Sequence, residues 1–480
     1  MDSVVLALEK MVDPISKSEF AIYHSRTHED TNQAAKRFLH STNDEVRLRR
    51  ADEYADFALA IVDMEETTYF RRAVLRRELI ADIDYQKQRD HAAHTLYNYL
   101  LGWYIFSNNE AMRQEIQRHF ILRLASRRAT MPPLEIANRF GNIWPFVSLL
   151  HDIGYIFEGS LSPMSTDTQN ERVRRGAAVV HDYFHHRFWS DTQLDSVTVR
   201  ALLVKKANMT IPDFELNSIA ATGDQLCTIG SVEIIRAAAR NELDKFGMRV
   251  SPILTKANGL SGDAFDLWMA HYAAYDLAGM VDRIKYMRAA YKALIWNGMP
   301  GIGVRLLDHG VCSGLLMLLH STFFYRLYFG IGDDEPSDPL EKQLWHFIKH
   351  ESVPEGVVYD AHWWWTGILW GTAAAALHNI QQLPNPLHGL REPIPALHLE
   401  EDPITYLGIL VDIVQEWDRY SVIPERRLLG NLPLQGTDVD LGFDHGLLVI
   451  NYHDSDCADV VKKSLDRALD SWTKIMRIEG

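Results

Sequence analysis

The sequence predicts an all-helical protein that ends in a small α/β appendage. Two observations support this. Apolar residues recur at three- and four-residue spacing through most of the chain, which is the period of a helix with a buried face. The clearest examples are residues 55–61, 94–105, 135–153, 196–204 and 407–417.

The second observation is a change of pattern near the end of the chain. Two short runs at 438–443 and 447–452 flank an Asp-His-Gly turn, which predicts a β-hairpin. Residues 456–478 then predict a single helix, with Ser455 or Asp456 as its N-cap. We therefore expect a small α/β element at residues 431–480.

Composition and charge limit the classes of partner. The chain has 480 residues, of which 47% are hydrophobic and 24% charged, as in ordinary folded proteins. Its net charge of −15 does not favour the binding of long nucleic acid, although a local phosphate-binding patch is compatible with this charge. Arginine-rich stretches at 47–50, 71–77 and 123–128 lie among acidic residues, so we expect them to be solvated helix faces.

The cysteines and the apolar segments predict a cytoplasmic protein with no membrane partner. The three cysteines are far apart and none lies in a CxxC pair, which argues against disulfides and zinc–thiolate sites. The first residues lack the basic and apolar regions of a signal peptide. Residues 363–377 are apolar but too short to span a bilayer comfortably, and they predict a buried helix.

Histidine or aspartate interrupts five otherwise apolar helical patterns. Burying such a side chain without a partner costs roughly 2–7 kcal/mol. A metal site between facing helices would explain all five interruptions. The central pair is His151-Asp152 in LLHDIGY, for which a helix-capping pair is the alternative interpretation. A second such pair, His181-Asp182, is not followed by Ile-Gly.

The motif LLHDIG, with a helical histidine upstream and a helical aspartate downstream, resembles the HD superfamily of metal-dependent phosphohydrolases. The family pattern H…HD…D matches His94, His151, Asp152 and Asp412. The resemblance implies an HD-type helical bundle with a metal ion on these residues. In the cyclic-nucleotide phosphodiesterases of this superfamily, an earlier histidine on the first helix donates a proton. The resemblance therefore assigns the metal to His94 and the proton to His91, and the reverse assignment stays open.

Two further motifs resemble the two-metal HD nucleases attached to CRISPR interference helicases. DHGVCSGLLML and AALHNI match the helices that supply two more histidines, which implies that His309 and His378 bind a second ion. The resemblance covers roughly residues 85–160 and 300–420. It departs from the family at Tyr155, where many relatives have Lys or His.

The resemblance also implies a domain organisation. We expect an N-terminal helical segment at 1–80, an HD domain at 81–430 with a long helical insertion at about 160–300, and the α/β appendage at 431–480.

The implied activity is hydrolysis of a phosphate ester or anhydride in a nucleotide, cyclic nucleotide or short oligonucleotide. One or two divalent ions (Mn, Ni, Fe, Co, Mg or Zn) would activate water, with Asp152 as the bridging carboxylate. Arg89 is a candidate to neutralise the developing charge. A plain ion-pair network of Asp412 with Glu416 and Arg419 is the alternative for that aspartate.

Other functions stay open or are excluded by motif. A nuclease specific for single strands is the second candidate. A nucleotide-binding sensor or scaffold without turnover is the third, with the C-terminal appendage serving a protein partner or self-association. The sequence has no Walker A pattern and no GxSxG elbow, and the glycines at 298–303 lack the spacing of a nucleotide-binding loop.

Overall fold

The computed structural model divides the chain into two compact units. The first contains Met1–Ile153, Ser160–Thr166 and Ala374–Gly480, and the second contains Gly154–Gly159 and Asp167–Ala373. The predicted boundaries at residues 80 and 430 stay predictions. The structure describes residues 2–16, 28–41, 43–60, 67–80, 91–124, 130–157, 169–189, 196–207, 219–231, 233–236, 262–298, 305–346, 349, 361–383, 394–418 and 434–480.

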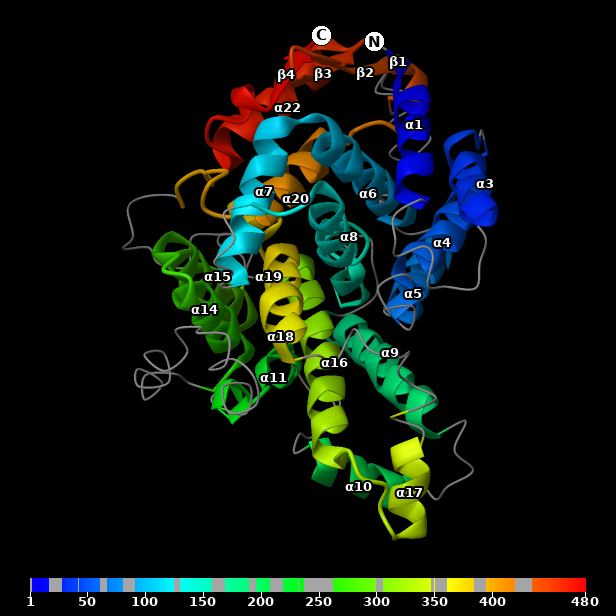
Figure 1. Cartoon of the computed structure of the whole chain (residues 1–480), viewed down its shortest axis with the longest axis vertical. Helices are drawn as coiled ribbons and strands as arrows, with labels where there is room; N and C mark the ends of the chain where they lie inside the picture. The colour runs from blue at the N-terminus through cyan, green and yellow to red at the C-terminus, as the bar shows by residue number, and fades with distance from the viewer. Residues whose placement is uncertain are drawn as a thin grey trace. The chain divides into compact units, whose positions relative to one another are not determined.

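The first unit is helical with one small sheet, as predicted (Figure 1). Its helices are α1 (Val4–Ser16), α3 (His28–Leu39), α4 (Asp44–Ala60), α5 (Thr68–Ile80), α6 (His91–Asn108), α7 (Glu110–Arg123), α8 (Pro133–Ser148), α20 (Pro403–Val414) and α22 (Ser455–Ala468), with short 3-10 segments at Ile380–Gln382, Gly436–Asp438 and Trp472–Lys474. A further 3-10 turn, η3 (Ile153–Ile156), follows α8.

Helix α6 forms the centre of this unit. It contacts α1, α4, α5, α7, α8 and α20, and its first sixteen residues are all buried. Helix α8 approaches α6 closely at Gly102, where an added Cβ would lie 2.0 Å from the Trp144 indole. The Trp144 Nε1 donates a hydrogen bond to the carbonyl of Tyr99 at 3.0 Å. This contact fixes the end of α8 beside α6, and the histidine–aspartate motif follows directly after that end.

The sheet joins the two ends of the sequence. Strand β1 (Asp2–Ser3) pairs with β2 (Val439–Asp444), β2 pairs with β3 (Leu447–Tyr452), and β3 pairs in parallel with β4 (Met476–Glu479). The β2–β3 hairpin is the predicted one, and its two turn residues have positive φ angles as such a tight turn requires.

The prediction of one helix over 456–478 is wrong in its second half. Helix α22 ends at Ala468, and Ser471 adopts a left-handed backbone conformation. The chain then continues through a 3-10 turn into β4, where buried and exposed residues alternate. The parallel edge of β3 stabilises this strand, and no local periodicity indicates that partner. The N-cap is Asp454, whose carboxylate accepts hydrogen bonds from two backbone amides.

The second unit is helical in every described element. It contains α9 (Gln169–Trp189), α10 (Ser196–Ala207), α11 (Ile219–Cys227), α14 (Ala264–Ala274), α15 (Ala278–Asn297), α16 (His309–Ile331), α17 (Pro339–His346), α18 (Ala361–Trp363) and a π-helical turn, η7 (Trp364–Ile368), which α19 (Leu369–Leu377) continues. The apolar segment at 363–377 is thus helical and buried, as predicted. No helix among the described residues is both long enough and apolar enough to span a membrane.

The arginine-rich stretches are not simply solvated helix faces, contrary to the prediction. Arg47, Arg71 and Arg123, which begin the three stretches, are buried with exposed fractions of 7%, 5% and 1%. Each buried guanidinium has polar partners on other residues, and these partners lie outside the local pattern of acids. Arg47, for example, pairs with the buried Asp418 at 3.3 Å and donates to the carbonyl of Ser41.

We expect Arg47→Met to lower the free energy of unfolding by about 3–5 kcal/mol, because it leaves the carboxylate of Asp418 buried without its cation. Urea denaturation of the full chain measures the change. Arg50→Met on the same helix is the control, since Arg50 pairs with Glu53 at the surface and should cost about 1 kcal/mol or less. Equal costs for the two variants would contradict the assignment.

Candidate metal centre

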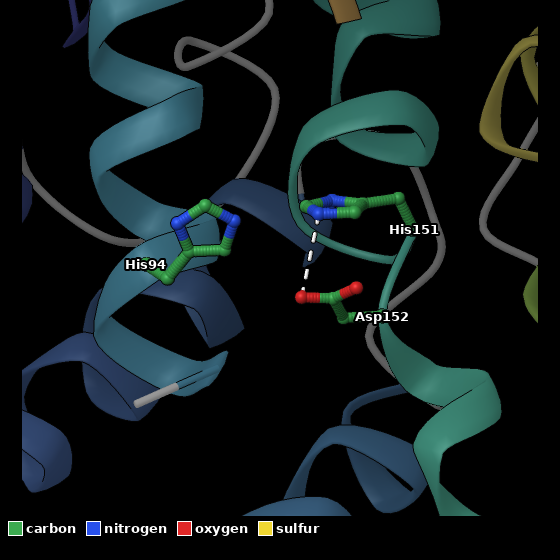
Figure 2. Close-up of side chains that lie close together, drawn as sticks. All are labelled: His94, His151 and Asp152. Atoms are coloured by element: carbon green, nitrogen blue, oxygen red, sulfur yellow. Dashed lines mark ion pairs between the residues drawn. The ribbon is translucent and has the colours of Figure 1, made fainter. Parts of the chain in front are cut away.

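Five of the predicted ligands meet in the first unit. His94 lies on the first turn of α6, and Asp412 lies on the last turn of α20. His151 and Asp152 follow the end of α8, and His378 follows the end of α19. All five are buried or nearly so, with exposed side-chain fractions between 1% and 15%. Figure 2 shows His94 facing the turn that carries His151 and Asp152.

The ring nitrogens of these histidines point at two carboxylates. His94 Nε2 lies 2.7 Å from Asp412 Oδ1, and His151 Nε2 lies 3.6 Å from the same oxygen. His151 Nε2 also lies 3.3 Å from Asp152 Oδ2. Asp412 therefore contacts two histidines, which does not favour the alternative of a plain network with Glu416 and Arg419. Arg419 itself lies outside the described residues.

Hydrogen bonds at the other ring nitrogen fix each histidine. His151 Nδ1 donates to the carbonyl of Ser148 at 2.9 Å, and His378 Nδ1 donates to the carbonyl of Ala375 at 2.7 Å. With Nδ1 protonated in the neutral ring, Nε2 carries the lone pair that faces the carboxylates. Metal-binding histidines have this arrangement, in which the second nitrogen donates to a carbonyl or carboxylate and orients the ring.

Gln415 does the same for His94, and the sequence analysis missed it. The Oε1 atom of Gln415 accepts a hydrogen bond from His94 Nδ1, while its amide nitrogen donates to the carbonyl of Trp417 at 2.5 Å. The second bond orients the amide so that its oxygen faces His94. The available signal was the spacing of Gln415, which lies three residues after Asp412 and directly after the end of α20.

Asp152 lies between two histidines. Its Oδ2 atom faces His151, and its Oδ1 atom lies 3.9 Å from His378 Nε2. The rings of His151 and His378 meet edge to face at 4.6 Å between centroids. A carboxylate with a different histidine at each oxygen has the geometry needed to contact two positions at once, and a capping pair would not require His378.

The charges of these groups depend on each other. Burial opposes the ionisation of Asp412, but the imidazoles of His151 and His94 more than offset it and hold the pKa of Asp412 well below its ordinary value of 3.8. Burial also opposes protonation of His151, yet the carboxylates of Asp152 and Asp412 raise the pKa of His151 above 6.5. A proton on His151 thus occupies the place that a metal ion could take.

These pKa shifts predict opposite pH dependences for the stability contributed by the ion pairs of His151 and for the stability contributed by bound metal. The raised pKa of His151 contributes stability below pH 6.5 that is lost as pH rises through its native pKa. The lowered pKa of Asp412 contributes stability above pH 3.8 that is lost as pH falls through its native pKa. Metal must displace the proton of His151, so its stabilising effect should grow as pH rises.

Thermal unfolding of EDTA-treated and manganese-loaded protein over a range of pH measures this difference. We expect the rise in Tm caused by manganese to be larger above pH 6.5 than below it, because the proton on His151 competes with the metal ion at lower pH. His453→Gln, which removes a half-exposed pair with Asp440, is a control that should leave both curves unchanged. A manganese shift independent of pH would contradict the prediction.

His91, the predicted proton donor, borders a hollow next to this cluster. It lies one turn before His94 on α6 and is buried, with an exposed fraction of 9%. A small hollow is lined by Arg71, Val74, His91, Ala92, Thr95, Leu149, Asp152 and Ile153. Arg71 is not among the residues predicted for the site. Arg89, which is, lies outside the described residues.

His309 belongs to the second unit, and its predicted part in metal binding stays a prediction. It begins α16, is half-buried, and stacks on the ring of Tyr155 at 4.0 Å between centroids. Gly154 packs on the same turn, where a Cβ would lie 2.0 Å from the carbonyl oxygen of His309. The Gly154 amide donates to Ser313 Oγ at 2.7 Å. This close approach explains why glycine follows His-Asp-Ile.

The second histidine–aspartate pair has a different environment. The side chains of His181 and Asp182 on α9 are 45% and 66% exposed. The dipeptide alone therefore does not create a buried site. The Ile-Gly sequence that follows Asp152, and does not follow Asp182, accompanies this difference in burial.

Comparisons of the chain with protein-family models, with curated proteins and with solved structures find no match. The buried histidines and carboxylates could hold a metal ion. A function has to be argued from the chemistry of the site itself.

Proposed function

We propose that the chain is a metal-dependent phosphohydrolase that acts on a nucleotide, a cyclic nucleotide or a short oligonucleotide. The observation that carries the proposal is the orientation of His94, His151 and His378. Each presents Nε2 to a carboxylate, while its Nδ1 is held by a carbonyl oxygen of the protein. Hydrogen bonding of one buried histidine would not require three imidazole rings to be oriented in this way around Asp152 and Asp412.

The donor set fits a divalent transition metal. Imidazole nitrogens favour Zn, Fe, Co and Ni, and the added carboxylates also suit Mn. His94, His151, Asp152 and Asp412 would hold the first ion, and His378 would approach a second position from the other oxygen of Asp152. A purely structural ion-pair cluster would not need Gln415 to set the tautomer of His94.

The residues of the chain would have separate tasks. Bound metal would supply Lewis acidity and a water activated near neutral pH. His91 would donate a proton to the leaving oxygen, for which its place beside Asp152 in the hollow is suitable. Burial of the cluster strengthens every charge interaction in the site, because bulk water is excluded.

Elemental analysis and a substrate panel test the proposal together. Purified protein should contain one or two transition-metal ions per chain. With manganese or nickel added, it should hydrolyse at least one of nucleoside triphosphates, cyclic nucleotides or labelled single strands. EDTA should abolish turnover and added metal should restore it. Full activity of a metal-free protein would refute the proposal, and metal-dependent nucleotide binding without turnover would favour the sensor instead.

A further inference from the structure

Asn98 lies beside the Nε2 atom of His94 and is not among the predicted ligands. It is on α6, one turn after His94, and it is buried with an exposed fraction of 1%. Its Nδ2 atom lies 3.1 Å from His94 Nε2, and the same Nε2 lies 2.7 Å from Asp412 Oδ1. An amide, an imidazole and a carboxylate from α6 and α20 therefore meet around the nitrogen that faces the candidate metal site.

The two ends of the Asn98 amide differ in their partners. Nδ2 donates to His94 Nε2, which can accept because Gln415 holds the proton of the neutral ring on Nδ1. Oδ1 is buried, and no residue in the described part of the chain donates a hydrogen bond to it. A buried amide oxygen without a donor is destabilising, so this atom calls for a partner from outside the chain.

A metal ion at His94 would change what Asn98 can do. The lone pair of His94 Nε2 and the oxygen of Asp412 repel each other at 2.7 Å unless a proton or a metal ion is shared between them. An ion takes this lone pair, and the N–H of Asn98 then loses its acceptor. Rotation of the amide by 180° exchanges Nδ2 and Oδ1, which occupy nearly the same space. The rotated amide presents its oxygen to the ion.

We propose that Asn98 is a further ligand of the metal ion and that its amide oxygen raises the affinity for manganese relative to zinc. It joins the four residues assigned to the first ion, which are His94, His151, Asp152 and Asp412. The inference rests on the proposed function only in requiring that this site binds metal.

The number and type of the ligands explain the effect on metal selectivity. The four residues assigned to the first ion already supply the four ligands of a tetrahedral zinc site. Manganese takes an octahedral shell and is well suited by carboxylate and carbonyl oxygens. A fifth ligand, and one with a carbonyl oxygen, therefore adds more to manganese binding than to zinc binding.

Titration of the metal-free full-length protein with Mn²⁺, and separately with Zn²⁺, tests the assignment without relying on turnover. Asn98→Leu should raise the Kd for manganese at least about 10-fold, which is the smallest loss typical even of residues outside the ligand shell. The Kd for zinc should change much less, because four ligands remain. The ratio of the two Kd values is the decisive readout, since general damage to the fold weakens the binding of both metals alike.

Asn98→Asp separates a ligand from a hydrogen-bond donor. The substitution keeps an oxygen at this position, but an ionised carboxylate cannot donate to His94. If Asn98 is a ligand, this variant should bind manganese at least as tightly as the wild type. If Asn98 only donates to His94, Asn98→Asp should lose manganese affinity as Asn98→Leu does.

Asn109→Leu is the matched control. It also removes a buried amide, at the N-cap of α7, so it should lower the stability of that helix and leave both Kd values unchanged. Three results would each overturn the assignment: unchanged manganese affinity in Asn98→Leu, an equal loss of both metals in that variant, or loss of manganese by Asn98→Asp. If far-UV circular dichroism shows that Asn98→Leu does not fold, the manganese affinity of Asn98→Asp decides alone.

Failure of this assignment and failure of the proposed function give different results. Metal-dependent hydrolysis with Kd values that do not depend on Asn98 would overturn the ligand and leave the phosphohydrolase standing. Manganese binding that needs Asn98, in a protein that hydrolyses nothing in the panel, would support the ligand and refute the enzyme. A wild-type protein that binds neither metal would overturn both.

Discussion

We expect His151→Ala and Asp152→Ala to lose the bound metal ion and, with it, at least about three orders of magnitude in turnover. His151 supplies a nitrogen that faces Asp412, and Asp152 contacts His151 and His378 through different oxygens. Removing either leaves too few ligands for the ion and an uncompensated buried charge. Elemental analysis after dialysis, followed by kcat with the best substrate of the panel, measures both effects.

Two further variants make this test specific. His181→Ala changes the exposed histidine–aspartate pair and should alter neither metal content nor turnover. Gln415→Ala removes the acceptor that orients His94 but no ligand, so metal affinity should fall roughly 10- to 100-fold rather than vanish. Retention of full metal by His151→Ala would mean that the cluster is a structural ion-pair network.

The second large effect separates proton transfer from metal binding. His91→Ala should keep its metal content near that of the wild type and lower kcat roughly 10²- to 10⁴-fold, as expected for a lost general acid. His378→Ala should instead halve the bound metal, because its Nε2 approaches Asp152 from the side opposite His151. His309→Ala should have the same effect if that histidine also binds the second ion. Metal analysis and steady-state kinetics on the same preparations distinguish these outcomes.

Other outcomes of these experiments would contradict the roles assigned to the histidines. If His91→Ala removes metal and His94→Ala does not, the roles of these two histidines are exchanged. If His378→Ala and His309→Ala leave both metal and kcat unchanged, the site holds one ion.

The convergence of the site could be predicted from the sequence because each of its residues breaks an apolar pattern. His94, His151, His378 and Asp412 lie in stretches that are otherwise buried, and polar groups in such positions need one another. The structure brings these four together with Asp152.

The features that the sequence did not predict depend on partners that are distant in sequence or that belong to the backbone. The burial of Arg71 is stabilised by carbonyls at positions 92 and 149, and a carbonyl leaves no trace in the pattern of side chains. Strand β4 depends on the edge of β3, and β1 depends on β2 at the other end of the chain. Local periodicity predicts which face of a helix is buried, but it does not predict which long-range neighbour replaces solvent.

The contact between His94 and Asp412 joins positions 318 residues apart, and this separation has a consequence for biosynthesis. At elongation rates of roughly 5–20 residues per second, α20 follows α6 from the ribosome after about 15–60 seconds. During that interval α6, which the native fold buries on every side, lacks the partner that supplies Asp412 and Gln415. We therefore expect the nascent chain to be a chaperone client, and metal loading to follow translation rather than to guide early folding.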